Sequence, residues 1–149
     1  MRAVVQRVTR ATVSIDGEVT GSIGNGLLVL LGVAMADTEK DADYVLEKTL
    51  NLRIFEDADD KMNVSLLEAG RDLLVVSQFT LYGDTRRGRR PSFIDAAPPV
   101  RANRLYEYFV TEAKKQVRKV ATGRFQAMMD VELTNSGPVT ILIDSQKTF

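Results

Sequence analysis

One short segment has the side chains best suited to chemistry: Ser77, Gln78, Phe79 and Thr80. It ends an apolar run, and hydroxyl and amide groups at a strand end can line a reaction site, although a plain polar strand terminus has the same composition. Thr80 could act as a nucleophile only beside a base, and the chain has no histidine to provide one. The backbone N–H groups are better candidates, because an oxyanion hole needs donors and no titrating group.

Composition limits the chemistry further. The 149 residues include no cysteine, no histidine and no tryptophan. Disulfides, thiolate nucleophiles and zinc sites with Cys ligands are therefore excluded, and the usual neutral-pH base and commonest metal ligand are missing. We expect no metal ion and no cofactor. Any catalysis must come from carboxylates, hydroxyls, lysine, the backbone or the substrate itself.

Four arginines within five positions form a concentrated basic segment: Arg86, Arg87, Arg89 and Arg90. The whole chain has 20 basic and 20 acidic residues, so its net charge of zero gives no general attraction to nucleic acid. Because arginine forks match phosphate oxygens, the segment predicts contact with a polyanion near Ser77 to Thr80. The alternative is a solvated charge run that pairs with the acidic turn at 56–60.

The third candidate is the segment Asn135-Ser136-Gly137-Pro138. Gly137 permits close approach of the backbone, and the bond before Pro138 can be cis at modest cost, which would aim two consecutive carbonyls the same way. From the residues alone, a plain turn between two hairpin strands is the favoured interpretation.

A fold with both strands and helices must position these segments. Hairpin signals at Asp16-Gly17 and Asn25-Gly26 separate β-rich runs. The run 27–33 is apolar on both faces, which predicts a central strand. We predict strands at 3–8, 11–15, 19–23, 27–33, 53–55, 72–82, 120–122, 128–134 and 139–144, and helices at 38–51 and 98–119.

Each predicted helix has one apolar face. Thr38 and Asp41 approximate a capping box for the first helix, and Pro98 and Pro99 suit the start of the second. The apolar faces are Ala42, Val45, Leu46, Thr49 and Leu50 in the first helix and Leu105, Tyr108, Phe109, Ala113 and Val117 in the second. Two long helices beside about eight short strands predict an α+β fold with the sheet curled toward a barrel.

We expect one domain over 1–149, because the length suits one domain and no linker, repeat or low-complexity segment occurs. No apolar run approaches the ~20 residues needed to span a bilayer, and the first residues lack the apolar region of a signal peptide. We therefore expect a cytoplasmic protein without membrane contact.

Five motifs carry a resemblance to a known family: MRAVVQRV at 1–8, NLRIF at 51–55, SQFTLY at 77–82, GRRPSF at 88–93 and NSGPVT at 135–140. On these motifs the chain resembles the D-aminoacyl-tRNA deacylases along its whole length. The resemblance implies hydrolysis of the ester that joins a D-amino acid, or glycine, to the 3′-terminal ribose of tRNA. It also implies a homodimer on a barrel-like α+β fold, with a site shared between the subunits.

The resemblance also implies roles for the candidate residues. Gly137 and Pro138 match a Gly-cisPro pair whose carbonyls enter the partner subunit's pocket, hold the substrate amino group and exclude an L side chain. The segment 77–80 matches the motif that lines the pocket for the terminal adenosine, and the Phe79 N–H is the expected donor to the substrate carbonyl. Thr80 has been considered a nucleophile in the family, but we favour attack by water assisted by the ribose 2′-hydroxyl.

Two further expectations concern the edges of this pocket. Phe125 and Met129 are expected to shape its amino-acid side, and from the resemblance we expect glycine in many relatives at the position where this chain has Gln126. This departure bears on the tolerance for larger D side chains. The arginine segment 86–90 is expected to add a salt-dependent contribution to tRNA binding.

Two other function classes remain open from the sequence. A non-catalytic RNA-binding module would use the arginine segment with the polar strand end and would bind RNA without turnover. A small-molecule esterase or amidase would use Thr80 or Ser77 with a lysine or aspartate, and would hydrolyse a model ester without tRNA.

Overall fold

The computed structural model describes all 149 residues. Its strands are β1 (Arg2–Ile15), β2 (Glu18–Ile23), β3 (Gly26–Gly32), β4 (Phe55–Glu56), β5 (Met62–Val64), β6 (Asp72–Ser77), β7 (Val120–Thr122) and β8 (Asp130–Asp144). Its helices are α1 (Glu39–Asn51), α2 (Leu66–Ala69) and α3 (Pro99–Lys114), with a one-turn 3₁₀ helix, η1 (Phe79–Tyr82).

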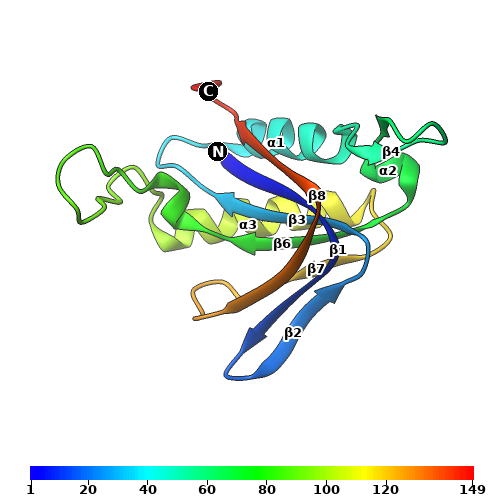
Figure 1. Ribbon diagram of the computed structural model, residues 1–149. Helices are drawn as coiled ribbons and strands as arrows, with labels where there is room; N and C mark the ends of the chain where they lie inside the picture. The colour runs from blue at the N-terminus through cyan, green and yellow to red at the C-terminus, as the bar shows by residue number, and fades with distance from the viewer.

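One curled sheet forms the body of the molecule (Figure 1). Its strands follow the order β2-β1-β3-β6-β7, with β8 paired to β1, while β4 and β5 form a separate hairpin. The long strand β1 joins the parts, because its first half pairs with β3, its second half with β2, and most of its length with β8. An apolar cluster fills the inside of the curl: Val8, Ala11, Val13, Ile23, Leu28, Leu74 and Val76. This architecture confirms the predicted α+β class with a barrel-like sheet.

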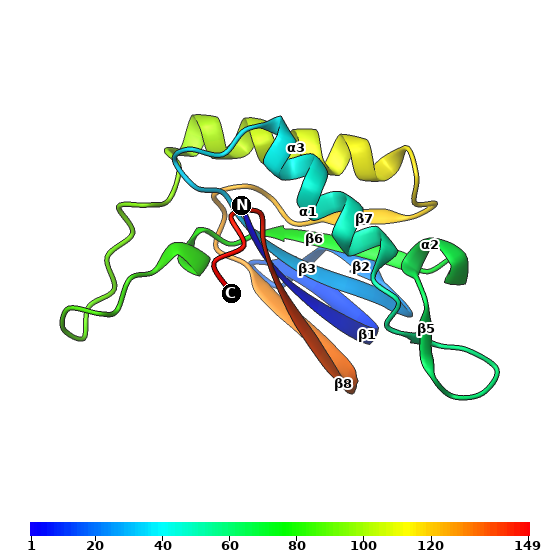
Figure 2. The same cartoon turned by 90° about the horizontal axis from the view of Figure 1, so that it is seen from above.

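The two long helices α1 and α3 cover one face of the sheet (Figure 2). Leu27, Val29 and Leu31 of β3 belong to the larger core that includes helix residues, whereas Leu28 belongs to the interior cluster. Strand β3 is therefore buried on both faces, as its continuous apolar sequence predicts. The connections through the helices join strands that pair in parallel, β3 with β6 and β6 with β7.

Helix α1 confirms its prediction closely. Its buried residues are the five of the predicted apolar face, and Thr38 caps its start in a capping box with Asp41. Helix α3 differs in two ways, since it ends at Lys114 and not near 119, and Tyr106 is buried in place of Tyr108. The Tyr108 hydroxyl instead donates to the Asp43 carboxylate of α1 at 2.8 Å, because that side of α3 faces the neighbouring helix.

Several predicted strand boundaries are wrong. The segments 3–8 and 11–15 form the single strand β1, and the strand predicted at 53–55 lies at 55–56. The run 72–82 changes at Ser77 from strand β6 to η1. Strand β5 and the single-turn helix α2 were not predicted, since elements this short have too little periodicity to recognise.

The segment 135–138 is not a hairpin turn, because both of its flanking segments pair with β1 and belong to one strand, β8. Gln6 lies opposite Thr140 and Val8 lies opposite Asn135, so the residues between them bulge outward opposite Arg7. A long partner strand lets the chain continue in one direction, and the extra residues form a bulge in place of a turn. The Gly137–Pro138 bond is cis.

Candidate functional site

The candidate segment begins at the carboxyl end of strand β6, which lies between β3 and β7 in the sheet. Ser77 is the last residue of β6 and pairs in parallel with Leu31 of β3, and the Gln78 N–H donates to the Leu31 carbonyl at 2.8 Å. The chain then tightens into η1, where the Gly83 N–H donates to the Thr80 carbonyl at 2.9 Å. The candidate residues therefore lie on the end of a strand and on the helical turn that follows it.

Two contacts hold η1 against the sheet. Gly32 of β3 lies so close that a Cβ atom there would be 3.0 Å from the Gln78 carbonyl oxygen and 3.1 Å from the Leu81 Cβ. The Arg2 guanidinium donates to the Leu81 carbonyl at 3.1 Å and lies 4.7 Å from the centre of the Tyr82 ring. The position of the turn is thus set by strands β1 and β3.

Residues 93–102 form a second wall of the site. The Phe93 ring meets the Phe79 ring edge to face, with 5.1 Å between their centroids. The Ala97 N–H donates to the Val33 carbonyl at 2.9 Å, which ties this segment to the end of β3 before α3 begins at Pro99. The sequence did not predict this wall, although its paired prolines marked the start of the helix correctly.

The connection between β7 and β8 forms a third wall. The Phe125 ring lies 6.0 Å from the Tyr106 ring of α3, which anchors the wall to the helix. Gln126 has a φ of 62°, a left-handed conformation that suits glycine better. Met129 lines the cavity beside it. A glutamine side chain therefore stands where glycine would leave the cavity wall bare.

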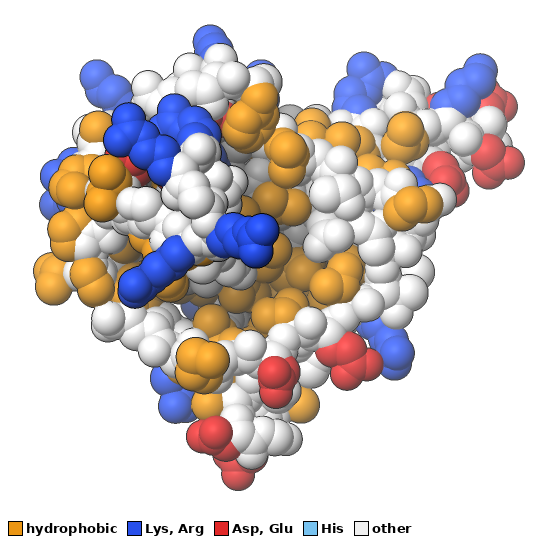
Figure 3. Space-filling model, turned by 60° about the vertical axis from the view of Figure 1, so that its left-hand side comes forward, with side chains coloured by type: hydrophobic (Ala, Val, Ile, Leu, Met, Phe, Trp, Pro, Cys, Tyr) orange, Lys and Arg blue, Asp and Glu red, His pale blue; other side chains and the backbone are white.

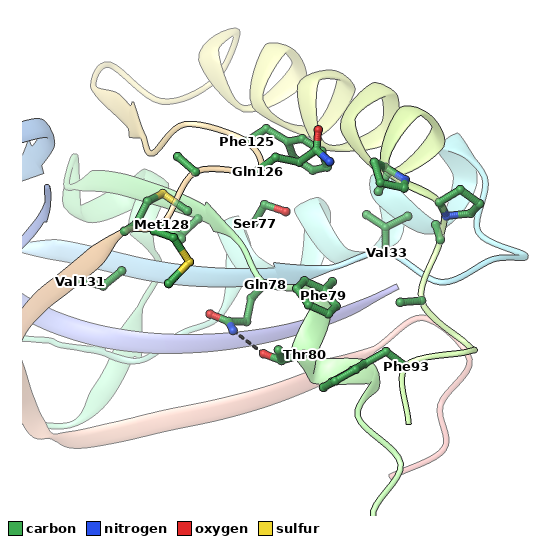
Figure 4. Close-up of a pocket in the computed structure, with 18 residues that line it drawn as sticks. Val33, Ser77, Gln78, Phe79, Thr80, Phe93, Phe125, Gln126, Met128 and Val131 are labelled. Carbon is green, nitrogen blue, oxygen red and sulfur yellow. Dashed lines mark hydrogen bonds between the residues drawn. The ribbon is translucent and has the colours of Figure 1, made fainter. Parts of the chain in front are cut away.

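These walls enclose a cavity of about 800 Å³ (Figure 4). None of the eighteen residues that line it has an ionisable side chain: Val33, Val76, Ser77, Gln78, Phe79, Thr80, Phe93, Ala96, Ala97, Pro98, Pro99, Ala102, Phe125, Gln126, Ala127, Met128, Met129 and Val131. Six predicted candidates are thus brought together: Ser77, Gln78, Phe79, Thr80, Phe125 and Met129. The cavity offers hydroxyls, amides and backbone groups in an otherwise apolar surface.

The contact between Gln78 and Thr80 bears on the chemistry of the hydroxyl. The Gln78 Nε2 donates to the Thr80 Oγ1, as the dashed line in Figure 4 shows. An amide nitrogen cannot accept the Thr80 proton, and no lysine, aspartate or glutamate lines the cavity. Neither Thr80 nor Ser77 therefore has in this cavity the base that a hydroxyl nucleophile needs.

The arginine loop, residues 84–92, lies next to the second wall. Asp84 and Ser92 pair through both backbone hydrogen bonds, at 2.8 and 2.9 Å, which closes its base. The Arg86 guanidinium donates to both oxygens of the Asp84 carboxylate, at 2.9 and 2.7 Å, and holds the pKa of Asp84 down at about 2. The other arginines of the loop are exposed: Arg87, Arg89 and Arg90. Figure 3 shows Lys and Arg side chains beside a hollow lined by hydrophobic side chains.

The arginine loop does not pair with the acidic turn at 56–60. Arg86 pairs with Asp84, and Glu56 of the acidic turn pairs with Arg7 at 3.5 Å. The two charged segments project from opposite ends of the molecule (Figure 1), so the pairing expected under that alternative is wrong. The arginines are exposed to solvent, and a role in binding stays a prediction.

Gly137 and Pro138 do not join the cavity of their own chain. Arg7 holds this bulge, since its Nε donates to the Ser136 carbonyl at 3.2 Å. Arg7 pairs with Leu27 of β3, whereas Ser77 pairs with Leu31 of the same strand. Four residues of strand correspond to about 13 Å, and β1 and β3 also lie between β8 and β6. Both Gly137 and Pro138 are exposed.

None of the helices is both long enough and apolar enough to cross a membrane.

Comparison with known proteins gives a consistent result. The family model described as D-Tyr-tRNA(Tyr) deacylase matches residues 4–144. The chain is 62% identical to a D-aminoacyl-tRNA deacylase of Kosmotoga olearia and 61% identical to one of Clostridioides difficile, over the full length of each chain.

Two solved structures share the fold. A c-Myc DNA unwinding element binding protein is 41% identical, with a TM-score of 0.92 over 97% of this chain and 98% of the other. A probable eukaryotic D-amino acid tRNA deacylase has a TM-score of 0.83 over 96% of this chain and 98% of the other, and at 17% identity it supports the fold alone. From the family model and the full-length relatives, the chain belongs to the D-Tyr-tRNA(Tyr) deacylase family, and it is a hydrolase.

Proposed function

We propose that this hydrolase cleaves the ester between a D-amino acid, or glycine, and the 3′-terminal ribose of tRNA. The observation that carries the proposal is the cavity at the end of β6, which combines polar groups with a wall free of ionisable side chains. A cavity of about 800 Å³ is within the range of small-molecule sites and has room for a nucleoside with an attached amino acid. Because the substrate belongs to translation, the proposal places the protein in the cytoplasm.

The chemistry of the proposal needs no titrating side chain. The oxygen of water bonds to the ester carbonyl carbon, the bond from that carbon to the ribose 3′ oxygen breaks, and the water proton ends on that oxygen. The ribose 2′-hydroxyl assists the attack. The Phe79 N–H, at the first residue of η1, donates to the carbonyl oxygen as negative charge develops there. Thr80 binds the substrate and does not attack it.

Chiral selection is assigned to Gly137 and Pro138 of a second subunit. Both residues are exposed and distant from their own cavity, so they can act at a cavity only in another copy of the chain. Gly137 has a φ of 119°, and a Cβ atom there would lie 2.9 Å from the Arg7 Nη2, so the bulge depends on glycine. Carbonyl groups inserted from the partner would accept hydrogen bonds from the substrate amino group and leave no room for an L side chain. The proposal therefore includes a homodimer with a site shared between subunits.

Binding of the tRNA is assigned to the arginine loop. Arg86 is already engaged by Asp84, which leaves Arg87, Arg89 and Arg90 for phosphate oxygens. The neutral cavity would then hold the reacting end of the substrate while the loop beside it binds the polyanion. Phosphate contacts position the substrate, and the cavity determines which ester is cleaved.

The decisive experiment compares D-Tyr-tRNA and L-Tyr-tRNA as substrates of the purified protein, with a generic small ester as control. We expect hydrolysis of the D ester, little hydrolysis of the L ester and none of the generic ester. Equal rates for the two tRNA esters would refute chiral selection. Binding of RNA without turnover would indicate an RNA-binding module, and turnover of the generic ester without tRNA would indicate a small-molecule esterase.

A further inference from the structure

Three large apolar side chains are exposed in this part of the chain, and two of them, Phe79 and Phe93, line the cavity. Phe79 is 55% exposed, Phe93 is 36% exposed and Ile94 is 76% exposed. The two rings are in edge-to-face contact, and Ile94 directly follows Phe93 in the chain. We refer to these three residues as the apolar rim. A contiguous exposed apolar patch at the edge of a binding cavity is typical of a surface that contacts a ligand or partner.

The apolar rim is continuous with the arginine loop. Phe93 comes directly after Ser92, whose backbone closes the base of the loop against Asp84. Phe93 is three positions after Arg90, so their backbones are no more than about 10 Å apart. Cations and apolar side chains therefore share one segment of the chain at the edge of the cavity.

Three of the four arginines in the arginine loop form no ion pair within the chain and can therefore contact a ligand. Both acidic residues of the segment 84–95 act on Arg86, since the bonded Asp84 carboxylate and then Asp95 raise its pKa. No ion pair engages the other arginines of the loop: Arg87, Arg89 and Arg90 form none with any residue of the chain. The surface is therefore positively charged beside the apolar rim, which suits a polyanion better than an apolar protein surface.

Exposed aromatic or apolar side chains next to a line of cations are the combination that binds single-stranded nucleic acid. We propose that the apolar rim and the arginine loop bind the unpaired nucleotides that immediately precede the terminal adenosine of the RNA substrate. Their bases rest on Phe93 and Ile94, and their phosphates contact Arg89 and Arg90. This inference rests on the proposed function, because it assumes that the terminal adenosine occupies the cavity.

The arrangement separates two parts of substrate binding. The cavity holds the terminal nucleoside and the amino acid, where the reaction takes place. Ile94 is the rim residue that does not line the cavity, and on this proposal it contacts only nucleotides that do not react, so it contributes to affinity before and during the reaction to the same extent. Loss of the Ile94 side chain should therefore raise KM and leave kcat unchanged.

The test uses Ile94→Ser with two substrates, D-Tyr-tRNA and the D-tyrosyl ester of adenosine alone. A base stacked on an aromatic side chain is worth a factor of about 5 to 160 in affinity, and we place an aliphatic side chain at the low end. We expect the KM for D-Tyr-tRNA to rise about fivefold with kcat unchanged, and the KM for the adenosine ester to stay the same. The matched control is Val19→Ser, a change at a residue of β2 that is 64% exposed and does not line the cavity.

Three results would overturn the inference. An equal rise in KM for both substrates would mean that Ile94 acts on the cavity, and no change with either would mean that the rim binds nothing. A changed sedimentation mass of Ile94→Ser would identify the rim as a contact between subunits.

Failure of the proposed function gives a different result, because the unaltered protein would then hydrolyse neither substrate. Binding of a fluorescent CCA trinucleotide then decides the inference by itself. About fivefold weaker binding by Ile94→Ser than by Val19→Ser supports a nucleotide-binding rim, and equal binding by the two variants refutes it.

Discussion

The contact between Gly32 and η1 gives a direct test of how the fold positions the proposed site. Gly32 is the last residue of β3, and its neighbours across the contact are the Gln78 carbonyl oxygen and the Leu81 Cβ, which a new Cβ would approach to 3.0 and 3.1 Å. The substitution Gly32→Ala fits only if η1 moves outward by a few tenths of an ångström. Because the nearest atom belongs to the backbone, the whole turn must move with it.

The size of the effect follows from this displacement. Misplacing a reacting group by 1 Å costs about 100-fold in rate, so about 0.4 Å corresponds to about sixfold if the cost grows evenly with distance. We expect kcat for D-Tyr-tRNA to fall about five- to tenfold. Overpacking of this kind costs about 1 kcal/mol at its mildest, which lowers Tm by about 3 °C in a protein of this size.

The assay is single-turnover hydrolysis of D-Tyr-tRNA at saturating enzyme, together with thermal unfolding followed by circular dichroism. Gly24→Ala is the matched control, because a Cβ at Gly24 would have no atom within 4 Å. A wild-type rate in Gly32→Ala would refute the argument that this contact positions the reacting groups, even if Tm falls. A comparable loss of rate in Gly24→Ala would show that the effect is not specific to η1.

Three further predictions concern separate features. Thr80→Ala should keep much of the wild-type kcat. A fall in kcat of about 10⁴-fold or more in a folded variant, as expected for removal of a nucleophile, would show that Thr80 is the nucleophile. Replacing Arg87, Arg89 and Arg90 by glutamine should reduce the slope of log K for tRNA against log salt concentration by about 2, at about 0.7 for each contact with a single strand; an unchanged slope would exclude the loop from binding. Tyr106 donates to the Val75 carbonyl at 2.9 Å, and burial raises its pKa to about 12, so its contribution to stability is complete below about pH 10 and is lost as the pH rises toward 12. In urea unfolding between pH 9 and 11.5, the free energy of unfolding should therefore fall by up to about 1.4 kcal/mol per pH unit. The fall should be smaller in Tyr106→Phe, and an equal fall in the two proteins would contradict this assignment.

Local features of the sequence predicted the elements they control. The apolar face of α1 and its capping box at Thr38 depend on residues within one or two helical turns of each other, and both are confirmed. The boundary errors come from pairing at a distance. The direction of the chain through Asn135 to Pro138 depends on whether β1 is long enough to pair on both sides of the segment, which the segment itself does not encode. Similarly, the packing of α3 beside α1 determines which tyrosine is buried. Tyr106 is buried, whereas Tyr108 is only partly buried and donates to Asp43 of α1.

The candidate site shows the same division. Hydroxyl and amide groups at the end of an apolar run marked the segment 77–80 from its composition. The residues of the opposite wall that line the cavity are all apolar: Phe93, Ala96, Ala97, Pro98, Pro99 and Ala102. They line it because Ala97 is tied to Val33 at the end of β3 and α3 begins there. Arg2 holds η1 by donating to the Leu81 carbonyl. Residues of this kind give no signal in the sequence, because their partners lie far along the chain.

The absence of histidine and cysteine agrees with the chemistry that this cavity favours. A charged base inside an apolar cavity would lose its hydration, and an isolated buried charge costs several kcal/mol unless it is paired. Placing a carboxylate or lysine beside Thr80 would therefore require a counter-charge, and both would occupy room that the substrate needs. In the proposed function, a substrate that brings its own 2′-hydroxyl avoids this requirement, while the charges proposed to bind RNA remain in water on the arginine loop. On that proposal, the reaction takes place in the neutral cavity and the polyanion binds at the charged loop.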